Sequence, residues 1–209
     1  MIDFYTWATP NGRKVSILLE ELGLDYETHA INITQGEQKT TEFLKINPNN
    51  KIPAIIDRDN GLALMESGAI LVYLAEKHDK FLPKDSIKRA QVMEWVMWQM
   101  GGFGPMLGQA HHYLHFNPGK AVYAEGRFRD EVTRLYSVLN DRLADRDYIC
   151  DDYSIADMAC WPWVSRYEWQ KVNLTDHPHV QRWYQSLLAR PAVQKGYHVP
   201  KNMGDIPSG

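Results

Sequence analysis

The 209-residue sequence has little cysteine, little net charge and no long apolar run. Two cysteines, Cys150 and Cys160, cannot build a disulfide framework or a zinc site by themselves. A formal net charge of -3 supplies no basic field for nucleic acid, and no apolar stretch approaches the roughly 18 residues of a membrane span. The N-terminus opens on a strand-like pattern, without a basic or cleavable apolar leader. We therefore expect a cytoplasmic protein that binds neither nucleic acid nor membrane.

Over the first eighty residues, apolar spacings typical of strands alternate with spacings typical of helices. The sequence Arg58-Asp59-Asn60-Gly61 between two short apolar runs predicts a β-hairpin. The expected order is βαβαββα, which builds a four-stranded mixed sheet. The alternating segments begin with a strand over 2–7, followed by patterns at 10–22 (helix), 26–33 (strand), 40–46 (helix), 52–57 and 62–65 (the hairpin), and a helix from about residue 67.

The second half of the chain carries no strand signal. A polar, proline-containing segment separates it from the first half, and the tail 198–209 has proline and glycine but no periodicity, so we expect that tail to be irregular. We predict an α/β domain over 1–79, a linker over 80–85 and an all-α domain over 86–209. The helical patterns of that second domain cover 86–115, 120–145, 154–170 and 178–190.

The sequence Asn50-Lys51-Ile52-Pro53 leads into an apolar strand. Pro53 has no N–H for a strand ladder, so it belongs at the first residue of the strand or at an edge. A trans proline here would only mark the start of the strand. A cis Ile52–Pro53 bond would turn the N–H and C=O of Ile52 away from the sheet, toward an extended peptide ligand. The local pattern leaves both alternatives open.

Glu66 and Ser67 stand where a helix is expected to begin. Ser67 is a natural N-cap, and the free N–H groups of a helix N-terminus favour a carboxylate. Glu66 beside it could accept an ammonium, so the pair could hold the head of an α-amino acid. An ordinary helix cap with a solvated Glu66 is the alternative.

The turn Thr9-Pro10-Asn11 joins the first strand to the first helix. Pro10 suits the first helical position, which makes Thr9 the N-cap. The Thr9 hydroxyl, the Asn11 amide and nearby N–H groups would form a cluster of hydrogen-bond donors. The alternative is that this turn caps the helix and does nothing more.

Three further features indicate structure rather than chemistry. Ser154 and Asp157 form a capping box at the start of an apolar helix. His111 and His115 have a metal-compatible spacing, but no nearby carboxylate or thiol completes a ligand set, so we expect no metal. Both cysteines are expected to be structural, Cys160 as a buried thiol.

The order and spacing of these motifs resemble those of the cytosolic glutathione transferases, over about residues 1–195. The residue sequences of these motifs are similar to those of the nu class. These are bacterial proteins related to the glutathione-transferase-like domain of a fungal nitrogen regulator. The resemblance implies a thioredoxin-like N-terminal domain, a helical C-terminal domain and a homodimer. The segments that carry it are TPNG, NPNNKIPAI, ESGAILVYLAEK, WQMGGFGPMLGQAHH and YSIADMACWPWV.

The resemblance also implies a glutathione site. A cis Pro53 would let the backbone of Ile52 pair with the cysteinyl part of glutathione. Ser67 and Glu66 would hold the γ-glutamyl head, and Arg127 would reach a second glutathionyl unit. The further positions implied are Lys51 and Gln38, for the glycyl carboxylate or peptide backbone, and Thr9 and Asn11, which stand where other classes place Tyr, Ser or Cys.

Nu-class proteins characteristically reduce disulfides with glutathione and conjugate only modestly. The turn has no cysteine, so an enzyme mixed disulfide is not expected, and we interpret the protein as a reductase whose thiols all come from the ligand. Thr9 and Asn11 would stabilise the ligand thiolate. Two alternatives stay open: conjugation of electrophiles, and a non-catalytic glutathione-binding regulatory module. If the protein conjugates electrophiles, the candidate residues that line the electrophile pocket are Trp7, Met106, Tyr113 and Trp163.

Overall fold

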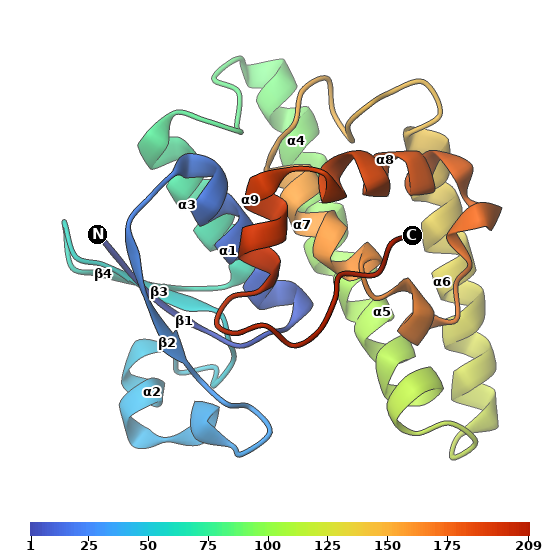
Figure 1. Cartoon of the computed structure of the whole chain (residues 1–209), viewed down its shortest axis with the longest axis horizontal. Coiled ribbons are helices and arrows are strands. Elements are labelled where there is room, and N and C mark those ends of the chain that lie inside the picture. The colour runs from blue at the N-terminus through green and yellow to red at the C-terminus, as the bar shows by residue number, and fades with distance from the viewer. The chain divides into compact units, whose positions relative to one another are not determined.

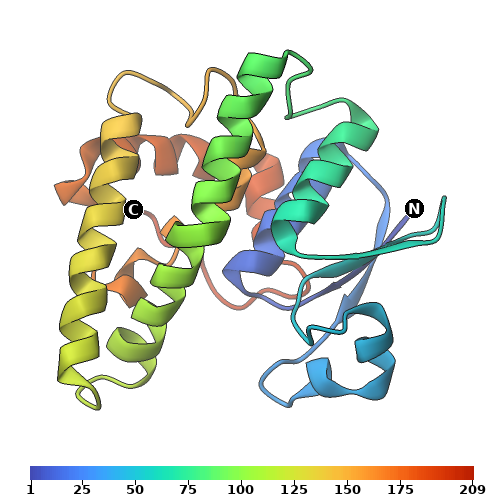
Figure 2. The same cartoon turned by 180° about the vertical axis from the view of Figure 1, so that it is seen from behind.

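The computed structural model describes residues 1–209 and contains two compact units (Figures 1 and 2). The first unit comprises 1–82 together with 189–206, and the second comprises 83–188 together with 207–209. The predicted division assigned everything from 86 onward to the second domain. The structure differs there, because the segment 189–206 packs with the N-terminal unit.

The first unit has the expected βαβαββα order and a four-stranded sheet with strand order β2-β1-β3-β4. Strands β1 and β2 run parallel, and β3 pairs antiparallel with both β1 and β4. Helices α1 and α3 cover one face of this sheet and α2 lies by the other (Figure 1). The elements are β1 (Ile2–Thr6), α1 (Pro10–Leu22), β2 (Tyr26–Ala30), α2 (Thr41–Ile46), β3 (Ala54–Asp57), β4 (Leu62–Met65), α3 (Ser67–His78) and α9 (Pro191–Tyr197).

The core of the first unit is made by the apolar stripe of each helix and the inward face of the sheet. Phe4 of β1 and Ile55 of β3 are fully buried, and so are Leu18 of α1 and Leu74 of α3. Gly23 ends α1 in the left-handed conformation, with φ of 67°, as its sequence position predicts. The periodicity of apolar residues in the sequence therefore predicted these helices and strands correctly.

Helix α9 was not predicted, and it packs along α1. The Ser16 hydroxyl donates a 2.7 Å hydrogen bond to the carbonyl of Gly196, and the Arg13 Nε donates to the carbonyl of Tyr197 at 3.0 Å. A Cβ on Gly196 would lie 2.8 Å from the backbone of Ile17, so only glycine permits this approach. Beyond α9, residues 198–209 form no helix or strand, which confirms the irregular tail.

The second unit is entirely helical, as predicted. Two π-helical turns, Gln99–Phe103 and His111–Phe116, flank α5 and make one helical run of the segment 86–116. None of these helices combines the length and the apolar character that a membrane span requires. The α-helices are α4 (Ser86–Trp98), α5 (Gly104–Ala110), α6 (Val122–Arg142), α7 (Ile155–Val164) and α8 (Pro178–Leu188).

The predicted capping box opens α7 and is fully buried. The Asp157 carboxylate accepts hydrogen bonds from the N–H groups of Ile149 (2.9 Å) and Ser154 (3.0 Å) and from the Trp183 indole (2.9 Å). Burial raises the pKa of this carboxyl to about 6. Asp157 therefore joins three segments of the helical unit, which confirms a structural role.

Candidate functional site

The opening turn has the predicted cap geometry. Thr9 is extended (φ -118°, ψ 160°), and its hydroxyl accepts a 3.2 Å hydrogen bond from the N–H of Gly12. No hydrogen bond within the chain uses the hydroxyl hydrogen of Thr9. A Cβ on Gly12 would lie 2.4 Å from both Thr6 Oγ1 and the Trp7 carbonyl, so the turn needs glycine to close. Half-buried Asn11 is the second residue of α1.

The peptide bond between Ile52 and Pro53 is cis, as the resemblance implied. These two residues lie just before β3, which begins at Ala54. No backbone hydrogen bond within the chain uses the N–H or the C=O of Ile52. The buried Asn47 side chain fixes the preceding residue, because its Nδ2 donates to the Lys51 carbonyl at 2.6 Å. The Ile52 backbone is therefore available to a ligand.

Helix α3 begins differently from the expectation. Ser67 is its first helical residue rather than its N-cap, and Glu66 occupies the cap position with a left-handed φ of 70°. No side chain caps this N-terminus. The buried Ser67 hydroxyl is instead 3.3 Å from the ammonium of Lys14, which donates to it from α1. Because helix N-terminal N–H groups attract anions, an uncapped terminus of this kind suits a carboxylate.

Strand register brings three of these segments to one end of the sheet. Tyr5 of β1 pairs with Ala54 of β3, and Ala54 pairs with Met65 of β4. Thr9 follows the first of these strands, Ile52 precedes the second and Ser67 follows the third. All three residues therefore lie beyond the same end of the strands. The Lys14–Ser67 contact further joins α1 to α3 there.

Gln38 and Lys51 lie on the surface of the same unit. Gln38 is in a 3₁₀ turn, Glu37–Lys39, and its side-chain Oε1 is buried without a hydrogen-bond partner. A buried acceptor of this kind is costly unless a ligand or a water molecule donates to it. The Lys51 side chain is exposed.

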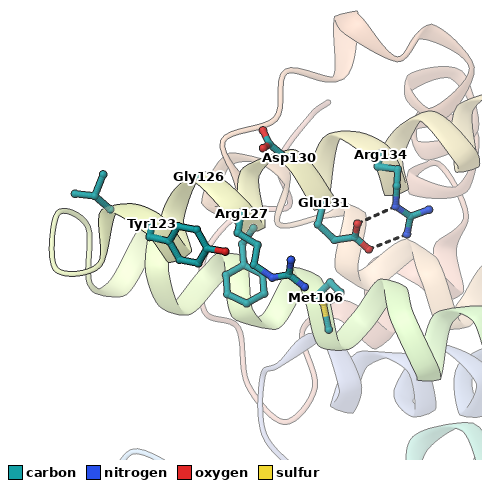
Figure 3. A pocket seen from close by; sticks show the side chains of 9 residues that line it. Met106, Tyr123, Gly126, Arg127, Asp130, Glu131 and Arg134 are labelled. Atoms are coloured by element: carbon teal, nitrogen blue, oxygen red, sulfur yellow. Dashed lines mark hydrogen bonds and ion pairs between the residues drawn. The ribbon is translucent and has the colours of Figure 1, made fainter.

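Arg127 lies in the other unit, on α6. It lines a pocket of about 700 Å³, together with Met106 of α5. Figure 3 shows the Arg127 side chain extending from α6 toward Met106, with Glu131 held nearby by Arg134. The complete lining is Met106, Val122, Tyr123, Gly126, Arg127, Phe128, Asp130, Glu131 and Arg134.

The other three candidates for the electrophile pocket, Trp7, Tyr113 and Trp163, do not line this pocket. Trp163 is buried and stacks on His111, with ring centroids 5.5 Å apart. Tyr113 stacks on Phe128 at 5.3 Å. Trp7 lies half-buried in the first unit, where the ammonium of Lys201 is 4.5 Å from its ring centroid.

Neither cysteine is placed for thiol chemistry. Cys150 and Cys160 are both buried in the helical unit. Burial raises the pKa of the Cys150 thiol to about 11, so this sulfur is overwhelmingly protonated at neutral pH.

A metal-compatible cluster that the sequence did not reveal lies on β1 and β2, away from the turn. The side-chain ligand atoms of Asp3, Glu27 and His29 lie within 4.8 Å of one another. The Arg58 guanidinium donates hydrogen bonds to both carboxylates and lowers the pKa of Asp3 to about 2. This cluster is therefore already charge-paired.

Family models match most of the chain. The model of the glutathione S-transferase N-terminal domain matches residues 2–76, and that of the C-terminal domain matches residues 103–191.

Curated relatives and solved structures agree with this match. The chain is 48% identical to the disulfide-bond oxidoreductase YfcG of Escherichia coli, covering 92% of this chain and 93% of YfcG. It is 40% identical to the disulfide-bond oxidoreductase YghU of the same organism, covering 98% and 77%. A glutathione transferase from Pseudomonas putida, solved with one glutathione disulfide per subunit, superposes with a TM-score of 0.90 at 43% identity, covering 95% and 91%. A Burkholderia graminis glutathione transferase, solved with two glutathione molecules per subunit, gives 0.89 at 45%, covering 96% and 88%.

Proposed function

The chain belongs to the glutathione S-transferase family, and we propose that it is an enzyme that reduces disulfide bonds with thiols supplied by glutathione. The observation that carries this proposal is the Thr9 turn. It presents an unused hydroxyl donor at the N-terminus of α1, while both cysteines are buried in the other unit. Relatives named for disulfide-bond oxidoreduction and a neighbour solved with glutathione disulfide support the reaction class.

Glutathione would bind along one end of the sheet. The N-terminus of α3 with Ser67 would take the γ-glutamyl carboxylate, and the exposed Glu66 carboxylate would take its ammonium. The backbone of Ile52 would pair with the cysteinyl unit, because its N–H and C=O have no partner in the chain. Gln38 and Lys51 would contact the peptide backbone or the glycyl carboxylate.

The turn can ionise the bound thiol without a side-chain base. A thiol with a pKa near 8.5 is only a few per cent thiolate at pH 7, and lowering that pKa by about two units requires about 2.7 kcal/mol. A hydrogen bond to a charged group supplies about 1.5–3 kcal/mol, and a helix N-terminus about 0.3–2 kcal/mol. The Thr9 hydroxyl or the Asn11 amide, together with the α1 N-terminus, therefore suffices.

The reaction needs two thiols, and both come from the ligand. The first glutathione thiolate attacks one sulfur of the substrate disulfide, which forms a mixed disulfide and releases one substrate thiolate. The second glutathione thiolate attacks the glutathione sulfur of that mixed disulfide, which releases the other substrate thiolate and leaves glutathione disulfide. Two protons from the thiols balance the two released thiolates. Arg127 would hold a carboxylate of the second glutathione.

A homodimer of the nu class, working in the cytoplasm, is the assembly and setting that we propose. The resemblance to that class supports this part of the proposal.

Conjugation of small electrophiles is the second candidate, and one observation favours it. The pocket lined by Met106 and Phe128 offers an apolar wall for an aromatic electrophile. A parallel assay with a chloronitrobenzene and a model disulfide separates the two activities. Higher turnover of the disulfide supports reduction, and higher turnover of the chloronitrobenzene overturns it. Tight glutathione binding with no turnover of either would identify a binding module.

A further inference from the structure

The tail that follows α9 brings a lysine to the turn that carries Thr9. The ammonium of Lys201 lies 4.5 Å from the ring centroid of Trp7, and Trp7 stands two residues before Thr9. We propose that Lys201 determines substrate specificity, by favouring disulfides that carry a carboxylate close to their sulfur atoms. This inference rests on the proposed function, because it names the substrate class of the same site.

Helix α9 fixes where the tail runs. The Arg13 Nε donates to the Tyr197 carbonyl at 3.0 Å, and the Arg13 guanidinium carbon lies 3.5 Å from the centroid of the Tyr197 ring. Arg13 belongs to the first turn of α1, so the tail starts beside the N-terminal end of that helix. Both views show the chain after α9 passing this end of α1 (Figures 1 and 2). The tail therefore leads directly from α9 to the turn at Trp7.

Trp7 is part of the turn itself. Its carbonyl accepts a hydrogen bond from the Thr9 N–H at 2.7 Å, and a Cβ added to Gly12 would lie 2.4 Å from the same carbonyl. The backbone of Trp7 is therefore fixed against the start of α1. Because the face of an indole ring attracts a cation, Trp7 holds the ammonium of exposed Lys201 beside the turn.

The charge of Lys201 is available to a substrate. Its ammonium forms no ion pair within the chain, and the first turn of α1 contains no acidic residue. The N-terminal end of α1 adds partial positive charge. A carboxylate on a disulfide that approaches a thiolate at Thr9 is therefore attracted by Lys201 and by α1 together. A neutral disulfide gains nothing from this charge, and a cationic one is repelled.

Three disulfides that differ in charge test this assignment. Dithiodipropionate carries two carboxylates, bis-hydroxyethyl disulfide is neutral, and cystamine carries two ammonium groups. The measured quantity is the ratio of kcat/KM for each charged disulfide to kcat/KM for the neutral one, at a fixed glutathione concentration. An exposed pair of opposite charges contributes about twofold to fivefold. Lys201→Met should lower the dithiodipropionate ratio by about this factor and raise the cystamine ratio.

Matched variants separate the charge of Lys201 from other effects of substitution. Lys201→Arg keeps the charge and the contact with an aromatic face, so it should retain the ratios of the wild type. Lys201→Glu should lower the dithiodipropionate ratio further than Lys201→Met does. Lys195→Met removes a cation of α9 that is paired with Glu20, and it should leave both ratios unchanged. Added salt should lower the dithiodipropionate ratio of the wild type and change that of Lys201→Met little.

The inference is overturned if Lys201→Met keeps the ratios of the wild type, or if Lys195→Met changes them as much. A lysine that only supported the turn, or only lowered the pKa of the bound thiol, would change kcat/KM for all three disulfides by one factor. That result leaves the ratios unchanged and also overturns the inference.

Two other results are equally decisive. If Lys201→Met does not fold, the wild type alone decides: salt should lower the dithiodipropionate ratio and raise the cystamine ratio, and the absence of either change overturns the inference. If the wild type reduces none of the three disulfides with glutathione, the proposed function itself fails, and the inference fails with it. Turnover of all three by the wild type with unaltered ratios in Lys201→Met overturns only the role of Lys201.

Discussion

Replacing Thr9 with alanine removes the cap of α1 and, if the proposed function is right, a hydrogen bond to the glutathione thiolate, and the two effects can be measured separately. The Thr9 oxygen caps α1 by accepting from the Gly12 N–H at 3.2 Å, and its hydroxyl hydrogen is left for a ligand sulfur. Loss of the cap should reduce the free energy of unfolding by about 0.5–2 kcal/mol. Loss of a hydrogen bond to a thiolate costs about 1.5–3 kcal/mol, which raises the pKa of the bound glutathione thiol by about one to two units.

The assay is a pH titration of the ultraviolet absorbance of the bound glutathione thiolate, together with disulfide turnover over the same pH range. Near neutral pH, Thr9→Ala should lower turnover by roughly tenfold or more, and higher pH should restore it, since each unit of thiol pKa is a factor of ten in thiolate. Glutathione affinity should change little, because in the proposed site the γ-glutamyl head binds at Ser67 and not at Thr9.

Thr40→Ala is the matched control for the cap. Thr40 caps α2 in the same unit, accepting from the Phe43 N–H at 3.3 Å. This variant should lose a similar free energy of unfolding and keep the thiol pKa of the wild type. If Thr9→Ala leaves both the thiol pKa and turnover unchanged, the donor role belongs to Asn11 or to backbone N–H groups. In that case Thr9 is only a cap and the reasoning above is refuted.

Two further predictions concern the helical unit. Asp157→Ala should cost about 2–6 kcal/mol of unfolding free energy, because it leaves the buried donors of Ile149 and Trp183 unpaired, at about 1–3 kcal/mol each. Urea denaturation would contradict this if the loss stayed near the ~1 kcal/mol of an exposed cap. Burial lowers the pKa of His111 to about 3, so the unfolded state binds a proton that the folded state excludes as pH falls below about 6.5. The free energy of unfolding should therefore drop by about 2 kcal/mol between pH 7 and pH 5. His111→Gln should abolish this part of the pH dependence, whereas the variant of an exposed histidine, His112→Gln, should keep it. If the free energy of unfolding depends equally on pH in all three proteins, His111 is not its source.

Much of the fold follows from local chemistry that a sequence displays directly. Thr9 and Gly23 mark the ends of α1 because one supplies a side-chain acceptor and the other tolerates a left-handed backbone. Asn60-Gly61 marks the hairpin for a similar conformational reason. The Ser154–Asp157 capping box was likewise predictable. Each of these signals acts within a few residues.

Features that depend on contacts distant in sequence were missed. Helix α9 is only seven residues long, and it is stabilised by packing on α1, about 180 residues away. The start of α3 at Ser67 was predicted, but its N-cap was wrong: Glu66 holds the cap position with a positive φ, which its residue type does not predict. The burial of Lys14 could have been predicted, since a lysine four residues before Leu18 lies on the apolar face of the helix. Its contact with Ser67 could only be found in the structure.

The most direct test of the central claim is the disulfide reductase turnover of the Cys150→Ala/Cys160→Ala double variant. Both thiols are buried, so circular dichroism and thermal unfolding must first establish that the variant is folded. If every reacting thiol comes from glutathione, the folded double variant retains the turnover of the wild type. Collapse of turnover in a folded protein that still binds glutathione would contradict the account and assign the chemistry to an enzyme cysteine.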